Sequence, residues 1–61
     1  MDTLPSSELT PGLFVVNKQK LEWGIGQIQS SLKNIVTVNF ENVGKKVINI
    51  KEINLELIKI Q

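Results

Sequence analysis

Few side chains in this chain could do covalent or acid–base chemistry, and their types favour binding over catalysis. The 61 residues include no His, Cys or Tyr, so proton transfer near neutral pH would need a strongly perturbed carboxylate or lysine. The Ser6-Ser7 and Ser30-Ser31 pairs have no accompanying base, which a nucleophilic serine requires within hydrogen-bond reach. The six carboxylates show the spacing of neither a calcium loop nor a zinc site. We therefore expect no enzyme activity, no cofactor and no bound metal.

The side chains best suited to hold a partner are one tryptophan and a group of amides. Trp23 is the only Trp, and it is predicted either as a plug over one end of a small barrel or as a partly exposed binding platform. The amides alternate with apolar residues, so they form either a solvated sheet face or a polar binding face whose donors and acceptors meet a partner. The candidate protein-binding residues are Trp23, Gln27, Gln29, Asn39 and Lys45.

The lysines suggest a second kind of partner. The formal net charge is only +1, which attracts a polyanion weakly because affinity for nucleic acid scales with the number of phosphates neutralised. The sequence has no arginine, so no Arg fork can bind guanine in a bidentate manner, which weighs against a sequence-specific DNA reader. The simpler interpretation is that the lysines beside hairpin turns only keep the domain soluble. The alternative to a protein partner is nucleic acid, bound weakly and without sequence preference through Lys33, Lys45, Lys46 and Lys51.

Short strands separated by turn residues must position these side chains. Five strands are predicted, over residues 13–17, 25–31, 35–41, 45–50 and 54–60. In the third, Val36, Val38 and Phe40 share one face, which is the two-residue period of a half-buried strand. The pattern predicts an all-β fold, a small five-stranded antiparallel barrel whose closure removes exposed strand edges. A helix over 51–61 is the alternative to the last strand.

Glycine and asparagine indicate where the chain turns. Gly12 and Gly44 are expected to take positive φ, and Asn34 is expected to supply the left-handed residue of the turn over 32–34. Gly24-Ile25-Gly26 lacks the third glycine of a dinucleotide-binding fingerprint, and a bulge or bend at a barrel corner explains it better. Residues 51–53 are predicted to form a single 3₁₀ turn.

Length and hydropathy predict one domain in a soluble, cytoplasmic protein. Residues 1–9 are expected to be a flexible polar lead-in from which Leu4 and Leu9 can dock, and residues 10–61 are expected to form the barrel. No apolar run approaches the ~20 residues that cross a bilayer, and the N-terminus lacks the order of a signal peptide. The absence of cysteine fits a reducing compartment.

Four motifs between Pro11 and Ile58 resemble a small bacterial domain family of unknown function. Its members share a PG-x-x-V start, a WG-x-G-Q-x-QS element, a VTVNFE strand and a GK-x-x-I/L hairpin, and all four occur here in that order. More distantly, the layout is similar to the Tudor-like domain at the C-terminus of superfamily I DNA repair helicases. It is also similar to the RNA polymerase interacting domain of the transcription-repair coupling factor and to CarD-like regulators.

The resemblance implies an SH3-like or Tudor-like barrel and, through the distant relatives, binding to RNA polymerase or nucleic acid. The favoured function is a non-enzymatic protein-interaction domain that docks on transcription or DNA-repair machinery. A weak, sequence-nonspecific nucleic-acid binding domain is the first alternative. The second is a structural or oligomerising subunit that pairs through an exposed strand or an apolar patch. A monomer that does not enter the membrane is the expected state.

Overall fold

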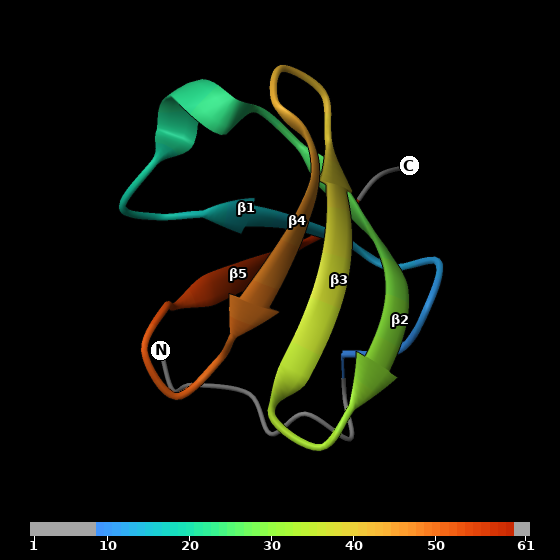
Figure 1. Cartoon of the computed structure of the whole chain (residues 1–61). Coiled ribbons are helices and arrows are strands. Elements are labelled where there is room, and N and C mark those ends of the chain that lie inside the picture. Colours follow the sequence, from blue (N-terminus) through green and yellow to red (C-terminus); the bar gives the residue numbers. More distant parts are fainter. Residues whose placement is uncertain (1–8, 60–61) are drawn as a thin grey trace.

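Five short strands form one antiparallel sheet in the computed structural model, which describes residues 9–59 (Figure 1). The order across the sheet is β4-β3-β2-β1-β5, so β4 and β5 are its edges. A short 3₁₀ helix, η2, lies in the connection between the first two strands. The elements are β1 (Phe14–Asn17), η2 (Leu21–Trp23), β2 (Gly26–Leu32), β3 (Ile35–Phe40), β4 (Gly44–Asn49) and β5 (Leu55–Ile58).

The predicted all-β fold with five antiparallel strands is confirmed, and each strand begins within one residue of its predicted start. Residues 55–58 form a strand, so the alternative helix over 51–61 is wrong. Among residues 9–59 the sheet is open, because no ladder joins β4 to β5, and its compact arrangement is consistent with the predicted small barrel-like fold. Within the same residues, no helix has the length and apolar character to span a membrane.

A β-bulge at Gln29 determines which side chains of β2 face solvent. Ile28 pairs with Val38 and Ser30 pairs with Thr37, so Gln29 is the extra residue on its strand. Because of this extra residue, Leu32 is exposed. Without it, the strict alternation of β2 would place Leu32 on the same face as the buried Gly26 and Ile28. The sequence predicts a bulge or bend at Gly24 to Gly26, but the observed bulge lies three residues after Gly26 on the same strand.

Within residues 9–59, seven apolar side chains are buried in the core, most of them on one side of the sheet, which we call the inner face. The predicted core face of β3 is confirmed, since its three alternating residues are all buried. Leu9 is only 2% exposed, so one of the two leucines that were expected to dock from the lead-in, Leu4 and Leu9, is packed in the core. Residues 1–8, the rest of that lead-in, lie outside the described part. The buried apolar residues are Leu9, Val15, Ile28, Val36, Val38, Phe40 and Ile48.

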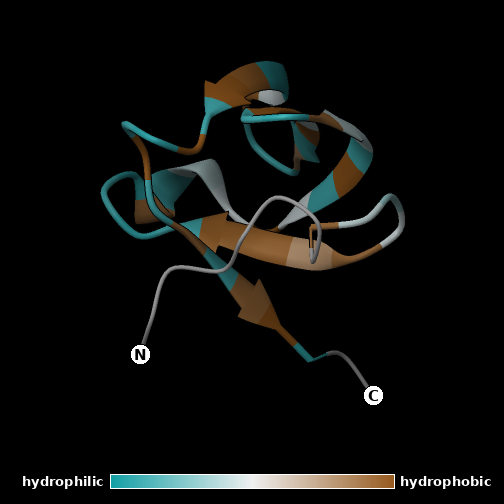
Figure 2. Cartoon of the chain, turned by 90° about the horizontal axis from the view of Figure 1, so that it is seen from below, coloured by the Kyte–Doolittle hydropathy of each residue, from teal (hydrophilic) through white to brown (hydrophobic). Residues whose placement is uncertain are grey.

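Hydrophobic and hydrophilic residues alternate along the ribbon, as Figure 2 shows. The opposite side of β2, β3 and β4, which we call the outer face, carries exposed or half-exposed side chains at the alternate positions. Partners on neighbouring antiparallel strands point to the same face, so register alone specifies which outer-face residues are neighbours.

The turns follow the predicted sites with two exceptions. Gly12 and Gly44 have φ of 97° and 76°, as expected. In the turn between β2 and β3, however, Lys33 and not Asn34 takes positive φ, at 56°. The Asn34 carbonyl instead accepts a hydrogen bond from the N–H of Ile50, at 2.9 Å, which fixes its peptide plane against the next turn.

The second exception concerns the predicted 3₁₀ turn. Residues 51–53 form a hydrogen-bonded turn in which the Asn49 carbonyl accepts from Glu52 and Ile53, at 2.9 and 3.1 Å. No 3₁₀ helix forms there. The 3₁₀ helix lies earlier, at η2, in the connection between the first two predicted strands.

Gly26 is required by close packing rather than by an unusual backbone angle. It lies between Val15 of β1 and Phe40 of β3 in the sheet. A Cβ at this position would overlap Cγ1 of Val38 and come within 2.7 Å of Cδ1 of Phe40. The missing side chain therefore leaves the space that the phenyl ring of Phe40 occupies.

We expect Gly26→Ala to lower the free energy of unfolding by about 1–3 kcal/mol, the usual cost of forcing extra volume into a packed core. Urea denaturation followed by circular dichroism measures this change. Ser30→Ala, an exposed position of the same strand, is the control and should change stability by less than about 0.5 kcal/mol. Equal stability of both variants would show that Val38 and Phe40 leave room for a Cβ at position 26.

Candidate functional site

Three exposed polar side chains form a row across the outer face, which we call the polar row. Asn39 in β3 is the cross-strand partner of Gln27 in β2 and of Lys45 in β4. All three are exposed. Directly opposed residues on antiparallel strands hold their Cβ atoms about 4.5–5.5 Å apart. Register therefore brings together three of the five residues predicted to bind a protein.

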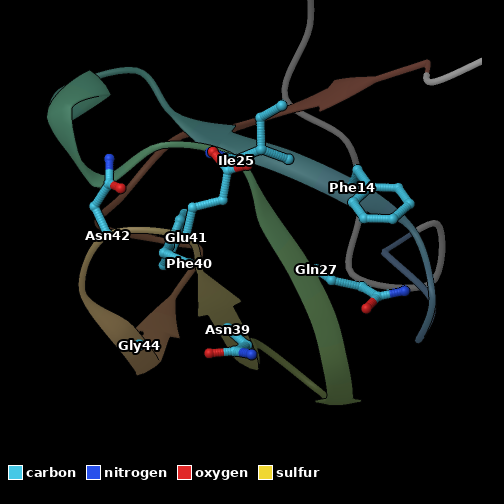
Figure 3. Close-up of a pocket in the computed structure, with 8 residues that line it drawn as sticks. All are labelled: Phe14, Ile25, Gln27, Asn39, Phe40, Glu41, Asn42 and Gly44. Atoms are coloured by element: carbon cyan, nitrogen blue, oxygen red, sulfur yellow. The ribbon is translucent and has the colours of Figure 1, made fainter.

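The polar row borders a pocket of about 500 Å³ (Figure 3). Phe14 pairs with Gln27 and lies half-buried on the side of the pocket away from Asn42 and Gly44. The apolar side chain of Ile25 also lines the pocket, so the pocket has both apolar and amide walls. The lining residues are Phe14, Ile25, Gln27, Asn39, Phe40, Glu41, Asn42 and Gly44.

The amides and the lysine of the polar row are largely available to a partner. Gln27 Nε2 donates to the carbonyl of Gly12 at 3.3 Å, which orients its amide over the turn before β1. Within residues 9–59, the side chains of Asn39 and Lys45 have no hydrogen-bond or ion-pair partner. Asn39 and Lys45 therefore offer donors and an acceptor that no other group within residues 9–59 satisfies.

Gln29 lies apart from the polar row. Its side chain is exposed on the bulge, and Nε2 donates to the carbonyl of Gln27 at 3.4 Å. A bulged residue has no cross-strand partner, so Gln29 does not face Asn39 in the way that Gln27 does. The alternation that suggested a single line of amides is interrupted at this residue.

Trp23 lies on the inner side of the sheet, away from the polar row. It is half-buried and packs against the core, with its ring edge-on to Phe40 at a centroid distance of 5.2 Å and an angle of 67°. Nζ of Lys46 lies 5.3 Å from the Trp23 ring centroid, within the range of a cation–π contact. Phe40 and Lys46 come directly after Asn39 and Lys45, which point to the outer face. Successive residues of a strand point to opposite faces, so Phe40, Lys46 and the Trp23 ring that they contact lie on the inner face. The geometry favours the plug over the binding platform.

Glu41 and Asn42, which the sequence analysis did not single out, hold the segment that carries Trp23. The Ile25 N–H donates to Oε1 of Glu41 at 3.0 Å, and the Glu41 N–H donates to the Ile25 carbonyl at 2.9 Å. Asn42 donates through Nδ2 to the Glu22 carbonyl at 2.9 Å and through its N–H to the Trp23 carbonyl at 3.0 Å. We call these four bonds the clamp.

No sequence signal reveals the clamp, because its side-chain bonds join residues 16 and 20 positions apart. Gly24 makes room for it, since a Cβ there would lie 2.8 Å from Oε1 of Glu41. Glu41 is thus a structural carboxylate that also lines the pocket. Within the described part of the chain, no group of three or more His, Cys, Asp or Glu residues is arranged to hold a metal ion.

The four lysines predicted for nucleic acid do not form one patch. Lys45 and Lys46 lie at the start of β4, whereas Lys51 follows the end of that strand. Lys33 lies in the turn after β2, which the bond from Ile50 to Asn34 places beside the Lys51 turn. Lys45 and the end of β4 are roughly 13 Å apart, from the rise per residue of a strand. The charges are therefore divided between opposite ends of the sheet, and Lys46 covers Trp23.

The fold and the pocket define a small all-β domain with a polar, solvent-exposed sheet face. The chain belongs to the family described as protein of unknown function (DUF3553), whose model matches residues 9–58. Comparisons with curated proteins and with solved structures found no match. The predicted membership of a domain family of unknown function is confirmed, while the likeness to Tudor-like and CarD-like domains stays a prediction. The match begins at Leu9, which is buried in the core.

We expect Trp23→Ala to lower the free energy of unfolding by about 2 kcal/mol, less than the 3–5 kcal/mol of a fully buried aromatic, because the ring is half-exposed. Chemical denaturation followed by circular dichroism measures the loss. Leu21→Ala is the matched control, since Leu21 lies in the same 3₁₀ helix and is 64% exposed. If Trp23→Ala were no less stable than the control, the plug would be refuted and the platform favoured.

The division of the lysines predicts poor binding to nucleic acid. We expect a dissociation constant above about 10⁻⁴ M for a labelled single-stranded oligonucleotide at physiological salt, the weak end of non-specific binding. Fluorescence anisotropy measures it, with Lys33→Gln and Lys45→Gln as variants from opposite ends of the sheet. Tight binding that falls steeply with salt and is lost in both variants would restore the nucleic-acid alternative.

Proposed function

We propose that this domain is a non-enzymatic protein-interaction module that docks on transcription or DNA-repair machinery through its outer face. The observation that carries the proposal is the polar row beside the pocket. Two amides and one ammonium group lie side by side there, and those of Asn39 and Lys45 have no partner within residues 9–59. RNA polymerase is the partner that the distant resemblance suggests.

The chemistry of the pocket suits a polypeptide partner. Amide side chains donate and accept at once, so Gln27 and Asn39 can pair with the N–H and C=O groups of an extended backbone. Phe14 and Ile25 add apolar area next to them, and binding energy at protein interfaces concentrates where an apolar anchor is surrounded by satisfied polar contacts. A pocket with both kinds of wall can thus supply orientation and affinity together.

Two observations count against the nucleic-acid alternative. The lysines are divided between the two ends of β4, which weakens the case for a nucleic-acid groove. The clamp uses one carboxylate oxygen of Glu41 and places that negative charge at the pocket, where it would repel a phosphate. Both features are compatible with a protein partner, whose backbone is neutral.

Capture of partners from the native host's lysate, after exhaustive nuclease treatment, tests the proposal. The bait is the tagged domain, and mass spectrometry identifies the retained proteins. We expect polymerase or repair subunits to be retained, and the double variant Gln27→Ala/Asn39→Ala to retain at least tenfold less of them. Glu56→Gln, an exposed position on β5, is the matched control and should retain as much as the parent.

Thermal unfolding of both variants first establishes that they are folded. Loss of every partner on nuclease treatment would overturn the proposal in favour of nucleic acid. Retention of the same subunits by the folded double variant would show that the partner docks elsewhere on the domain.

A further inference from the structure

Three large aliphatic side chains are exposed next to the polar row, and we call them the apolar trio. Leu32, Ile35 and Val47 are 74%, 43% and 71% exposed. Leu32 and Ile35 are cross-strand partners, and Val47 pairs with Thr37, two residues from Ile35. Their strands are adjacent in the sheet, so the three side chains lie on neighbouring positions of the outer face.

The apolar trio and the polar row form one continuous surface. Val47 lies two residues after Lys45 on the same strand and face, which separates them by about 6.6 Å along the strand. Isolated apolar residues are ordinary on protein surfaces, but a contiguous group rimmed by polar residues marks an interaction site. The binding surface therefore extends beyond the pocket, toward the turn between β2 and β3.

The charged residues within β2, β3 and β4 have one sign. No Asp or Glu lies within β2, β3 or β4, whereas Lys33 follows Leu32 directly and Lys45 precedes Val47 on the outer face. Glu41 lies at the far end, at the pocket, with Oε1 bonded to Ile25. Glu52 follows Lys51 in the turn after β4 and offsets that lysine alone. The apolar trio is thus flanked on two sides by lysines.

We infer that the segment docked on this surface is an acidic one that carries aliphatic side chains. Its carboxylates meet Lys45 and Lys33, and its aliphatic side chains cover the apolar trio. The inference rests on the proposed function and adds the chemistry of the partner. Complementary charge speeds encounter and rejects wrong partners, and the aliphatic contacts supply the dehydrated area.

A second copy of this chain fits the same surface less well. Two such faces would bring lysines against lysines with no carboxylate from these strands between them, which is a repulsive arrangement. The surface is therefore matched to a short segment of another protein.

Titration of the ¹⁵N-labelled full chain with two synthetic peptides tests the inference. One peptide alternates Glu with Leu, and the other alternates Lys with Leu at the same length. We expect the Glu/Leu peptide to shift the amide resonances of Ile35, Lys45 and Val47, and the Lys/Leu peptide to leave them unchanged. Adding salt should weaken the binding, because exposed charges are screened.

Two variants and a control sharpen the test. Lys45→Glu and Val47→Ser should each weaken binding of the Glu/Leu peptide at least tenfold, and Lys59→Glu, beyond β5, should not. Val47 is 71% exposed, so its truncation should leave the fold intact, and the amide spectrum reports this directly. Absence of shifts with the Glu/Leu peptide, or equal shifts with both peptides, would overturn the inference.

The remaining outcomes separate the inference from the proposed function. Shifts at the apolar trio that grow with protein concentration, without any peptide, would identify a second copy as the occupant. If lysate partners are lost in Gln27→Ala/Asn39→Ala but retained by Lys45→Glu and Val47→Ser, the proposed function stands and the inference falls. If nuclease treatment removes every lysate partner, the proposed function is overturned, and the inference that rests on it is overturned with it.

Discussion

The pairing of β2 with β3 determines both faces of this domain. Gly26 lies opposite Phe40 in that ladder, so the absence of a side chain on one strand admits a phenyl ring from the other. Three residues later the bulge at Gln29 shifts the alternation, which keeps Ile28 in the core and exposes Leu32. The same ladder thus fixes the depth of the core, the position of the polar row and the existence of the apolar trio.

Much of the fold could be predicted because local chemistry specifies it. Alternation in β3 identified its buried face, and the glycines at 12 and 44 identified two turns, since positive φ is inexpensive only without a Cβ. Where prediction failed at the turn between β2 and β3, the type of turn decided the outcome. Asn34 is intrinsically more tolerant of left-handed φ than Lys33, yet a two-residue hairpin connection puts positive φ on its first residue, which is Lys33.

The candidate site was only partly predictable for a related reason. Gln27, Asn39 and Lys45 could be chosen by residue type, but their adjacency depends on register, which a single sequence specifies weakly where a bulge is present. The clamp was invisible because it joins segments distant in the chain. Trp23 was ambiguous since Trp suits both a core and an interface, and its contacts with Phe40 and Lys46 are what distinguish the two.

The position of Trp23 also makes the domain its own optical reporter. It is the only Trp in the chain, so all indole emission comes from one environment, beside Phe40 and under the ammonium of Lys46. The clamp holds the segment that carries this indole through bonds separate from the ladders of the sheet. Release of the segment around η2 would therefore change the emission while the circular dichroism of the strands persists. Local opening and global melting can thus be followed separately without attaching a dye.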